Sequence, residues 1–323
     1  MKFLLAPLAD FTDAPFRRMC FEGGADLVYT EMVSAAALAH GNSPTRHLME
    51  TMDGEGPVAC QIFGATESDV AAAAREVEKV KGRFAELNLN AGCPMTRITR
   101  SGAGAKLIED PEKVFRLLKA MCENSSLPVT LKTRLGPHPK DVRIFELVDA
   151  AEKAGAKGVA VHARFTSQMH GGPLDLELLS EVVVRSSLPV TGNGSVRTPS
   201  DVEAMAAAGV ESVMIGRAAL SDPGIFAVLK GRDNPWSRFE AVRSHLKYIL
   251  EFRERLLGKF PDDHIRGADA FASVKMHTHL FRYFNGLPGA AKLRAELNSI
   301  RTLAEIESAI KSFNDRSDGF SAP

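Results

Sequence analysis

The sequence predicts an α/β fold, a TIM (β/α)8 barrel followed by a C-terminal all-helical domain. Three observations support this prediction. From residue 3 to about residue 230, short β-rich runs alternate with amphipathic helical stretches. The runs number eight, which suits a closed parallel barrel better than an open doubly wound sheet. Beyond Trp236 the β-rich runs disappear and only helical patterns remain.

The elements follow one another in regular order. Strands are predicted at residues 3–6, 27–31, 58–63, 86–90, 129–134, 158–162, 190–192 and 212–215. Between them, one helix is predicted at residues 67–81, and another at residues 201–208 after Thr198-Pro199-Ser200. In the tail, helices are predicted at residues 239–257, 268–284 and 290–313. We therefore expect a barrel domain at residues 1–235 and a helical domain at residues 236–323.

Composition narrows the class of protein. The chain has 323 residues, 45% hydrophobic and 25% charged, with a net charge of +0, so any site for a polyanion must be a local patch. The tail from residue 237 is slightly basic, with 14 Lys and Arg against 11 Asp and Glu. No segment approaches the roughly 20 apolar residues of a membrane span, so we expect no membrane partner. Four cysteines without metal-type spacing predict neither a metal site nor disulfides, and therefore a cytoplasmic protein.

The most informative stretch is residues 86–94, Glu-Leu-Asn-Leu-Asn-Ala-Gly-Cys-Pro. It alternates like a buried strand and then stops at a Gly-Cys-Pro turn, which presents the thiol of Cys93 where the chain leaves the sheet. A free cysteine is usually a small buried hydrophobe, and the other three cysteines fit that description. Cys93 differs, because Gly and Pro flank it.

The run after this turn, residues 95–105, is basic and bears glycines. Its Arg97 and Arg100 could lie against a phosphate backbone or another anion. A strand-end thiol beside cationic residues predicts proton transfer to an anionic or polyanionic substrate.

Polar residues also end the other strands. In a barrel the active site lies at these carboxyl ends. The collected residues are Pro7 and Ala9, Glu31, Gln61, Asn90 with Cys93, Lys132 with Arg134, His162 with Arg164, Asn193 with Gly194, and Gly216 with Arg217. Polar side chains within apolar strands are costly to bury without partners, so we expect each of them to have one.

Two glycine turns follow the last two strands. Residues 191–195 and 214–219 put Gly194 and Gly216 at the position after strands seven and eight where many barrels bind phosphate. Arg217 could add a charge-assisted contact, so the turns predict a phosphate-bearing cofactor. Lys132 would then suit a flavin ring, since a cation near the pyrimidine end stabilises the reduced cofactor. The alternative for Lys132 is a buried salt bridge.

Together these residues resemble the tRNA-dihydrouridine synthases. The resemblance spans residues 3 to about 230 in order, and the Asn-x-Gly-Cys-Pro turn is its most specific part. The motifs are Ala6-Pro7-Leu8-Ala9 with Thr12-Asp13, Asn90-Ala91-Gly92-Cys93-Pro94, Gly102-Ala103-Gly104, Lys132-Thr133-Arg134, Val161-His162-Ala163-Arg164, Gly192-Asn193-Gly194 and Gly216-Arg217. The tail agrees in length and place with that family's tRNA-binding domain.

The resemblance implies a flavoprotein that reduces uridines of the tRNA D-loop with NADPH through FMN. It implies FMN contacts from Pro7, Leu8, Ala9, Gln61, Lys132, His162, Asn193, Gly194, Ser195, Gly216 and Arg217. It also implies that Cys93 gives a proton to uracil C5 while hydride from reduced FMN reaches C6, with Asn90 and Arg134 near the base. An ordinary thiol has a pKa of about 8.5, so it can serve as an acid near neutral pH.

Some positions depart from the family pattern. Ser195 stands where relatives often carry Asp, and Leu176 where many carry Trp, which leaves the subfamily open. Two other functions remain possible from the sequence. One is another FMN barrel such as a dihydroorotate dehydrogenase, against which the Asn-Gly-Cys-Pro turn and the helical tail count. The other is a non-catalytic RNA-binding barrel, which an intact Cys93 and Lys132 disfavour. We expect a monomer.

Overall fold

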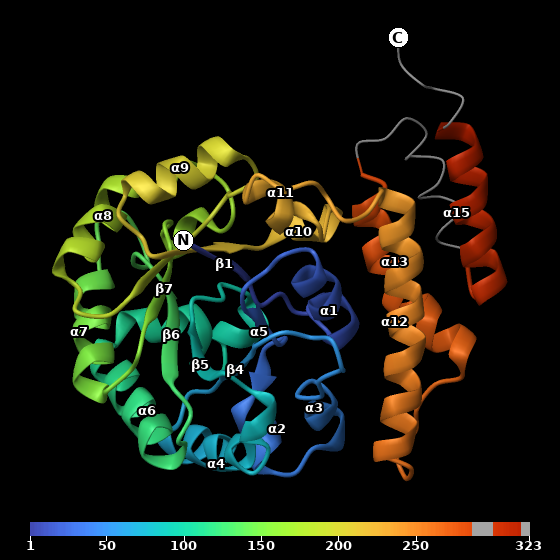
Figure 1. Ribbon diagram of the computed structural model, residues 1–323. Helices are drawn as coiled ribbons and strands as arrows, with labels where there is room; N and C mark the ends of the chain where they lie inside the picture. The colour runs from blue at the N-terminus through green and yellow to red at the C-terminus, as the bar shows by residue number, and fades with distance from the viewer. Residues whose placement is uncertain (286–299, 318–323) are drawn as a thin grey trace.

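The computed structural model describes residues 1–285 and 300–317, and one sheet of parallel strands dominates it. The strand order is β1-β9-β8-β7-β6-β5-β4-β2, with β3 pairing β4 as well. Leu4 of β1 also pairs in parallel with Leu27, next to β2, which brings the two ends of the sheet together. The helices lie around the outside of this ring (Figure 1). The predicted TIM barrel is therefore confirmed.

All eight predicted strands are present within one or two residues of their predicted bounds, except that the second is split. The strands are β1 (Lys2–Leu5), β2 (Val28–Tyr29), β3 (Val33–Ser34), β4 (Val58–Phe63), β5 (Glu86–Ala91), β6 (Val129–Arg134), β7 (Val159–His162), β8 (Val190–Asn193) and β9 (Ser212–Ile215). The predicted strand at residues 27–31 thus stops at Tyr29, and β3 was not predicted. At the break, the hydroxyl of Thr30 accepts the backbone N–H of Gln61 at 3.0 Å, so a side chain replaces one ladder bond.

The two faces of the sheet have different surroundings. The outer face packs on the helices through a large aliphatic core that includes Leu5, Ile62 and Leu89. The interior of the barrel holds only a small apolar cluster, made of Leu4, Ala6, Tyr29, Ala59, Ala160 and Met214. Other interior positions are polar, among them the fully buried Gln61 and Asn88. This half-polar interior leads up to the site described below.

Most of the longer helices of the barrel begin at a residue whose side chain caps them. The longer ones are α1 (Ala14–Glu22), α4 (Glu67–Glu78), α6 (Pro111–Asn124), α7 (Ile144–Ala154), α8 (Leu176–Arg185) and α9 (Pro199–Ala207). Short ones are α2 (Ala35–Ala39), α3 (Ser43–His47), α5 (Thr96–Thr99), α10 (Arg217–Ser221) and α11 (Ile225–Leu229), with the 3-10 turns η1 (Lys81–Arg83), η2 (Gly104–Glu109) and η3 (Thr166–Gln168). The predicted helix at 67–81 ends at Glu78, before η1. Thr198 and Asp201 form a capping box at α9, so that helix begins two residues before its predicted start.

The C-terminal region is helical, as predicted. It contains α12 (Arg238–Lys259), α13 (Ala268–Tyr283) and α15 (Leu303–Ser317), with α12 and α13 side by side next to the barrel (Figure 1). The predictions for residues 239–257 and 268–284 are confirmed. Of the helix predicted at 290–313, residues 290–299 lie outside the described part of the chain. None of the described helices has the length and apolar character needed to cross a membrane.

A second hydrophobic core joins the helical region to the barrel. It consists mainly of α12 and α13 residues such as Ile249 and Met276, but it includes Met19 of α1. Polar contacts accompany it, since Tyr248 donates to a carboxylate oxygen of Glu22 at 2.8 Å. The separate core supports a domain division near residue 235, and that boundary stays a prediction.

Candidate active site

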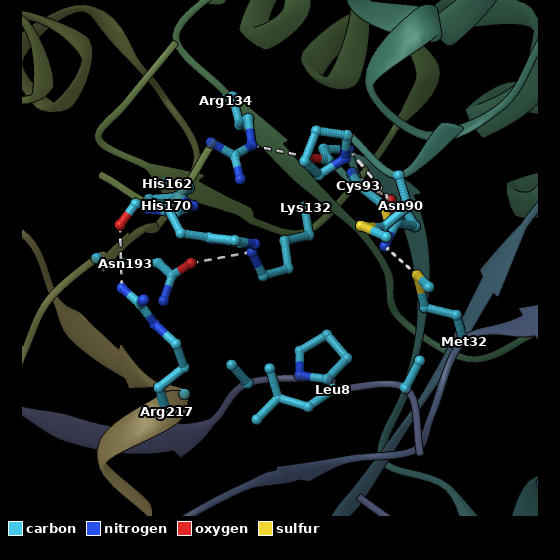
Figure 2. Close-up of a pocket in the computed structure, with 18 of the residues that line it drawn as sticks. Leu8, Met32, Asn90, Cys93, Lys132, Arg134, His162, His170, Asn193 and Arg217 are labelled. Atoms are coloured by element: carbon cyan, nitrogen blue, oxygen red, sulfur yellow. Dashed lines mark hydrogen bonds between the residues drawn. The ribbon is translucent and has the colours of Figure 1, made fainter. Parts of the chain in front are cut away.

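A cavity of about 220 Å³ opens at the carboxyl ends of the barrel strands. Figure 2 shows its side chains converging from several strands. The predicted site residues that line it are Pro7, Leu8, Ala9, Asn90, Cys93, Lys132, Arg134, His162, Asn193, Gly194, Ser195, Gly216 and Arg217. The parallel arrangement explains this convergence, because every strand delivers its last residues to the same edge.

Asn90 fixes the turn that carries the thiol. Its Oδ1 atom accepts the backbone N–H groups of Gly92 at 3.1 Å and of Cys93 at 3.0 Å. The carbonyl of Cys93 accepts the N–H of Ala105 at 2.9 Å. Gly104 permits this approach, because its φ is +60° and a Cβ there would lie 2.7 Å from the Cys93 oxygen. The half-buried Cys93 side chain is therefore held at the cavity by contacts on both sides of its turn.

The cavity wall is rich in cations and, within the described residues, has no Asp or Glu. We call Lys132, Arg134 and Arg217 the cationic wall, and the imidazoles of His162 and His170 lie beside them. Neutral groups accept its hydrogen bonds: Lys132 donates to Asn193 Oδ1 at 3.0 Å, and Arg217 to the His170 carbonyl at 3.2 Å (Figure 2). Arg134, only 2% exposed, donates to the carbonyls of Gly92 and Met169. These positive charges face the cavity without a carboxylate partner, which fits an anionic ligand.

The pKa values of the residues that line the cavity reflect the lack of carboxylate partners. Burial, and then repulsion from Arg134, lowers the pKa of Lys132 to about 7. Burial lowers the pKa of Arg134 to about 10. Burial and the neighbouring Lys132 hold the pKa of His162 far below its ordinary value, so its imidazole is neutral. An anion bound here would favour the charged forms and reverse these shifts.

A second group of cations surrounds the turn after β8. Gly194 has φ +133° and Ser195 has φ +51°, a conformation that non-glycine residues rarely adopt. Arg164, which is 4% exposed, donates to the Ser195 hydroxyl at 2.7 Å. Burial, followed by Arg217 and Arg197, lowers the pKa of Arg164. Three arginines therefore gather around one strained turn of the cavity, a pattern suited to a phosphate.

Three predicted site residues lie outside the cavity wall. Gln61 is fully buried behind Asn90 and binds the amides of Asn88 and Asn90. Arg97 and Arg100 lie exposed at the short helix α5, beyond the Cys93 turn. Their contacts with cofactor and substrate stay predictions.

The sequence reasoning missed two lining residues, Met32 and His170. Met32 enters through the break between β2 and β3, and the Asn90 amide points to its sulfur at 3.0 Å (Figure 2). His170 stacks on His162 with ring centroids 6.0 Å apart. The one available signal for His170 was Gly171-Gly172, a turn able to fold the loop back onto its own strand.

One group of side chains outside the cavity has the composition of a metal site. Potential ligand atoms of Asp13, His245 and His279 lie within 4.8 Å of one another between α1 and the helical region. His245 Nε2 and His279 Nδ1 have no hydrogen-bond partner in the part of the chain that is described. However, the Lys275 ammonium lies 3.1 Å from Asp13 and would repel a cation. That the protein holds no metal stays a prediction.

Comparison with known proteins gives concordant results. The family model described as dihydrouridine synthase (Dus) matches residues 4–317. The chain is 34% identical to a probable tRNA-dihydrouridine synthase of Rhodobacter capsulatus over 79% of this chain and 82% of that one. It is 29% identical to tRNA-dihydrouridine synthase B of Pseudomonas aeruginosa, over 98% of this chain and 93% of that one. A solved structure of 2-naphthoyl-CoA reductase shares the fold, with TM-score 0.53 and 12% identity over 72% of this chain and 50% of that chain.

Proposed function

The chain belongs to the dihydrouridine synthase family, and from this premise we propose that it reduces uridine in tRNA to 5,6-dihydrouridine, with FMN bound in the cavity and NADPH as reductant. One observation carries the proposal: a wall of uncompensated cations faces a thiol whose turn is fixed by hydrogen bonds. The names of the two relatives support tRNA as the substrate.

The residues of the cavity fit FMN. The arginines around Ser195 suit its phosphate, and Lys132 suits the end of the flavin ring that becomes negative on reduction. A Cβ at Gly216 would lie 3.5 Å from the Cβ of Ala6, so glycine keeps this part of the cavity open. When bound, FMN would supply the hydride that uracil C6 receives. We expect the remaining contacts from Pro7, Leu8, Ala9, Gln61, His162, Asn193, Gly194 and Arg217.

Cys93 would supply the proton. As C6 gains hydride, the C5=C6 double bond opens and C5 takes the proton from Cys93 Sγ, leaving a thiolate that water reprotonates. Arg134 would stabilise this thiolate, because the two groups interact electrostatically and Arg134 stays positive. We expect Asn90 and Arg134 to lie beside the base.

The tRNA would meet the protein outside the cavity. Arg97 and Arg100 are exposed next to the Cys93 turn, and the helical tail carries the modest basic excess. Phosphate contacts from these residues would position a D-loop uridine over the cavity. We expect this enzyme to act as a cytoplasmic monomer.

Purified protein tests the proposal. The chromophore is released and weighed by mass spectrometry, and the holoenzyme is incubated with NADPH and tRNA that lacks dihydrouridine. We expect FMN, and dihydrouridine in the D-loop. A colourless protein that FMN does not reconstitute, or a holoenzyme that leaves tRNA unchanged, would refute the proposal. Turnover of dihydroorotate instead would favour the other FMN barrel enzyme.

A further inference from the structure

A line of hydrogen-bonded polar side chains runs through the barrel interior to the Cys93 turn. It crosses β4, β5 and β6, which are neighbours in the sheet (Figure 1). Thr130 donates to Glu86 at 3.0 Å, and Asn88 donates to Thr130 at 2.7 Å. Gln61 donates to Asn88 at 2.7 Å, and Asn90 donates to Gln61 at 2.9 Å. Glu86 and Asn90 are four residues apart on β5, about 13 Å along the strand.

Both ends of this line fix its direction. At the upper end, the N–H groups of Gly92 and Cys93 can only donate, so Asn90 must present its oxygen to them and its amino group to Gln61. At the lower end, Thr130 has one proton, which it gives to Glu86, so it must accept from Asn88. Both ends require the same amide orientations.

Reversing one amide would therefore place two donors or two acceptors against each other within the buried line of side chains. If Asn90 turned over, its amino group would face the N–H groups of the Cys93 turn, and two hydrogen bonds would be lost. Gln61 and Asn88 are fully buried, so bulk solvent would not replace the hydrogen bonds that a reversed amide loses. The line reaches a cavity at each end: Asn90 lines the active-site cavity, and Glu86, Asn88 and Thr130 line a separate cavity of about 370 Å³ at the amino end of the barrel.

We propose that Glu86 and Thr130 are positioning residues for Cys93, acting through the hydrogen-bond relay of Asn88, Gln61 and Asn90. The inference rests on the proposed function of Cys93 as proton donor. Loss of the relay allows the amides to reverse. In a fraction of the molecules the Asn90 oxygen then no longer accepts the backbone N–H of Cys93. The thiol then occupies its working position less often, although neither Glu86 nor Thr130 touches the cavity that holds it.

The test compares two substitutions of one residue in the holoenzyme. Thr130→Val removes the hydroxyl with little change of shape, and Thr130→Ser restores it. Rapid mixing measures flavin reduction by NADPH and flavin reoxidation by tRNA. Separately, iodoacetamide labels Cys93, and peptide mass spectrometry gives the rate. For Thr130→Val we expect reoxidation about tenfold slower, equivalent to one lost hydrogen bond, and a Cys93 labelling rate changed at least about threefold. Flavin reduction should stay within about twofold.

Thr130→Ser should restore both rates to within about twofold of wild type. Thr191→Val is the matched control, because Thr191 of β8 lines the same lower cavity but is not part of the relay. It should leave both rates unchanged. If Thr130→Val does not fold, Glu86→Ala at the lower end of the relay should change both rates in the same direction.

Wild-type labelling and reoxidation in a folded Thr130→Val variant would overturn the relay. So would equal losses in Thr130→Val and Thr130→Ser, which would point to packing rather than to the hydroxyl. The two proposals fail separately. A wild-type holoenzyme that makes no dihydrouridine refutes the function, whereas the labelling contrast between Val and Ser still decides whether the relay positions Cys93.

Discussion

The cavity and the junction between barrel and helical tail each enclose a lysine, and the two lysines behave in opposite ways. Lys132 of the cationic wall has only neutral acceptors, and burial with Arg134 lowers its pKa to about 7. Lys275 of α13 lies 3.1 Å from Asp13. Burial alone would lower its pKa too, but Asp13 and Glu31 outweigh burial and raise it. A buried cation with a carboxylate partner is part of the structure, and one without a partner marks a place for an anion.

The pKa of Asp13 is set by the same two opposing effects, burial and charged neighbours. Burial would raise its pKa, but Lys275 and the two histidines lower it to about 2, so it is ionised at every pH of interest. Its other oxygen accepts the N–H of Phe16 at 3.2 Å and caps α1. The charges of Lys275 and Asp13 are thus paired with each other at the junction, whereas those of the cavity have no carboxylate partner. Substitutions should therefore change ligand binding and turnover at the cavity, and stability at the junction.

The largest effect should come from Cys93→Ala. It removes the proton donor but no buried charge and no core contact, so flavin binding and the unfolding free energy should stay near wild type. A positioned general acid contributes about 100-fold to 10,000-fold, so turnover should fall by that factor. Stopped-flow measurement should find normal bleaching of the flavin by NADPH and slow reoxidation by tRNA. Dihydrouridine formed at the wild-type rate would remove Cys93 from the mechanism.

Lys132→Met should weaken FMN binding by about 10-fold to 100-fold, the equivalent of one or two charge-assisted hydrogen bonds. The apoprotein should lose no stability, because a cation repelled by Arg134 is replaced by an apolar side chain. Fluorescence titration gives the affinity for FMN, and urea unfolding of the apoprotein gives the stability. A large loss of apoprotein stability would mean that Lys132 is structurally paired after all.

Lys275→Met should have the complementary effect. Asp13, with 8% of its side chain exposed, would lose its cationic partner, and the unfolding free energy should fall by about 1–2 kcal/mol. This range allows for the 32% exposure of Lys275 itself. FMN affinity should change less than about threefold. Comparing the Lys132→Met and Lys275→Met variants is preferable to deleting the tail, since deletion would also expose barrel residues of the shared core, such as Met19.

The depressed pKa of Lys132 predicts a pH dependence of FMN binding. In the unfolded chain this lysine keeps its proton up to its usual pKa of 10.5, but in the apoprotein it loses it above about pH 7. An anionic ligand restores the proton, so binding takes up a proton above pH 7 and weakens as pH rises. From pH 7 to pH 8 the affinity should fall about fivefold. Calorimetry in buffers of different ionisation enthalpy measures the uptake, and Lys132→Met should abolish it.

The smallest effect should come from the exposed arginines beyond the Cys93 turn. Arg97→Ala with Arg100→Ala should reduce the slope of tRNA affinity against salt by about 1.4 to 1.8, because each phosphate contact contributes about 0.7 to 0.9. FMN binding should be unaffected. Arg75→Ala is the matched control, since Arg75 is likewise an exposed arginine, on α4, and does not line the cavity. Equal slopes in wild type and the double variant would remove both residues from the tRNA interface.

Much of this fold was predictable, because its strands are short apolar runs and parallel strands bring their polar ends to one edge. That rule predicts Asn90, Lys132 and Asn193 at one edge of the sheet, and the structure has all three in one cavity. The helical tail was predictable for a similar reason, since its apolar residues recur at helical spacing. The exception among the strands is the break before β3, where the Thr30 hydroxyl accepts a hydrogen bond from the backbone N–H of Gln61 on another strand.

The details that depend on neighbours in space were not predictable. Lys132 and Lys275 are the same residue type, and nothing local distinguishes one that lacks a carboxylate partner from one that has it. Gln61 lies behind Asn90 rather than at the cavity surface, because its amide hydrogen-bonds Asn88 and Asn90 of β5. His170 reaches the site from a loop after β7, which no strand pattern marks.

The pairing of β1 with β9 has a consequence for how the protein is made. Lys2 pairs with Ser212, so β1 cannot pair with β9 until about 210 further residues have been synthesised. At ordinary rates of synthesis this takes about 10–40 s. Throughout that interval the apolar Leu4 and Leu5 lack their final neighbours on β9, so this edge of the sheet stays unpaired. The cavity takes Pro7 from the start of this span and Arg217 from its end, so its wall is complete only after the barrel has closed.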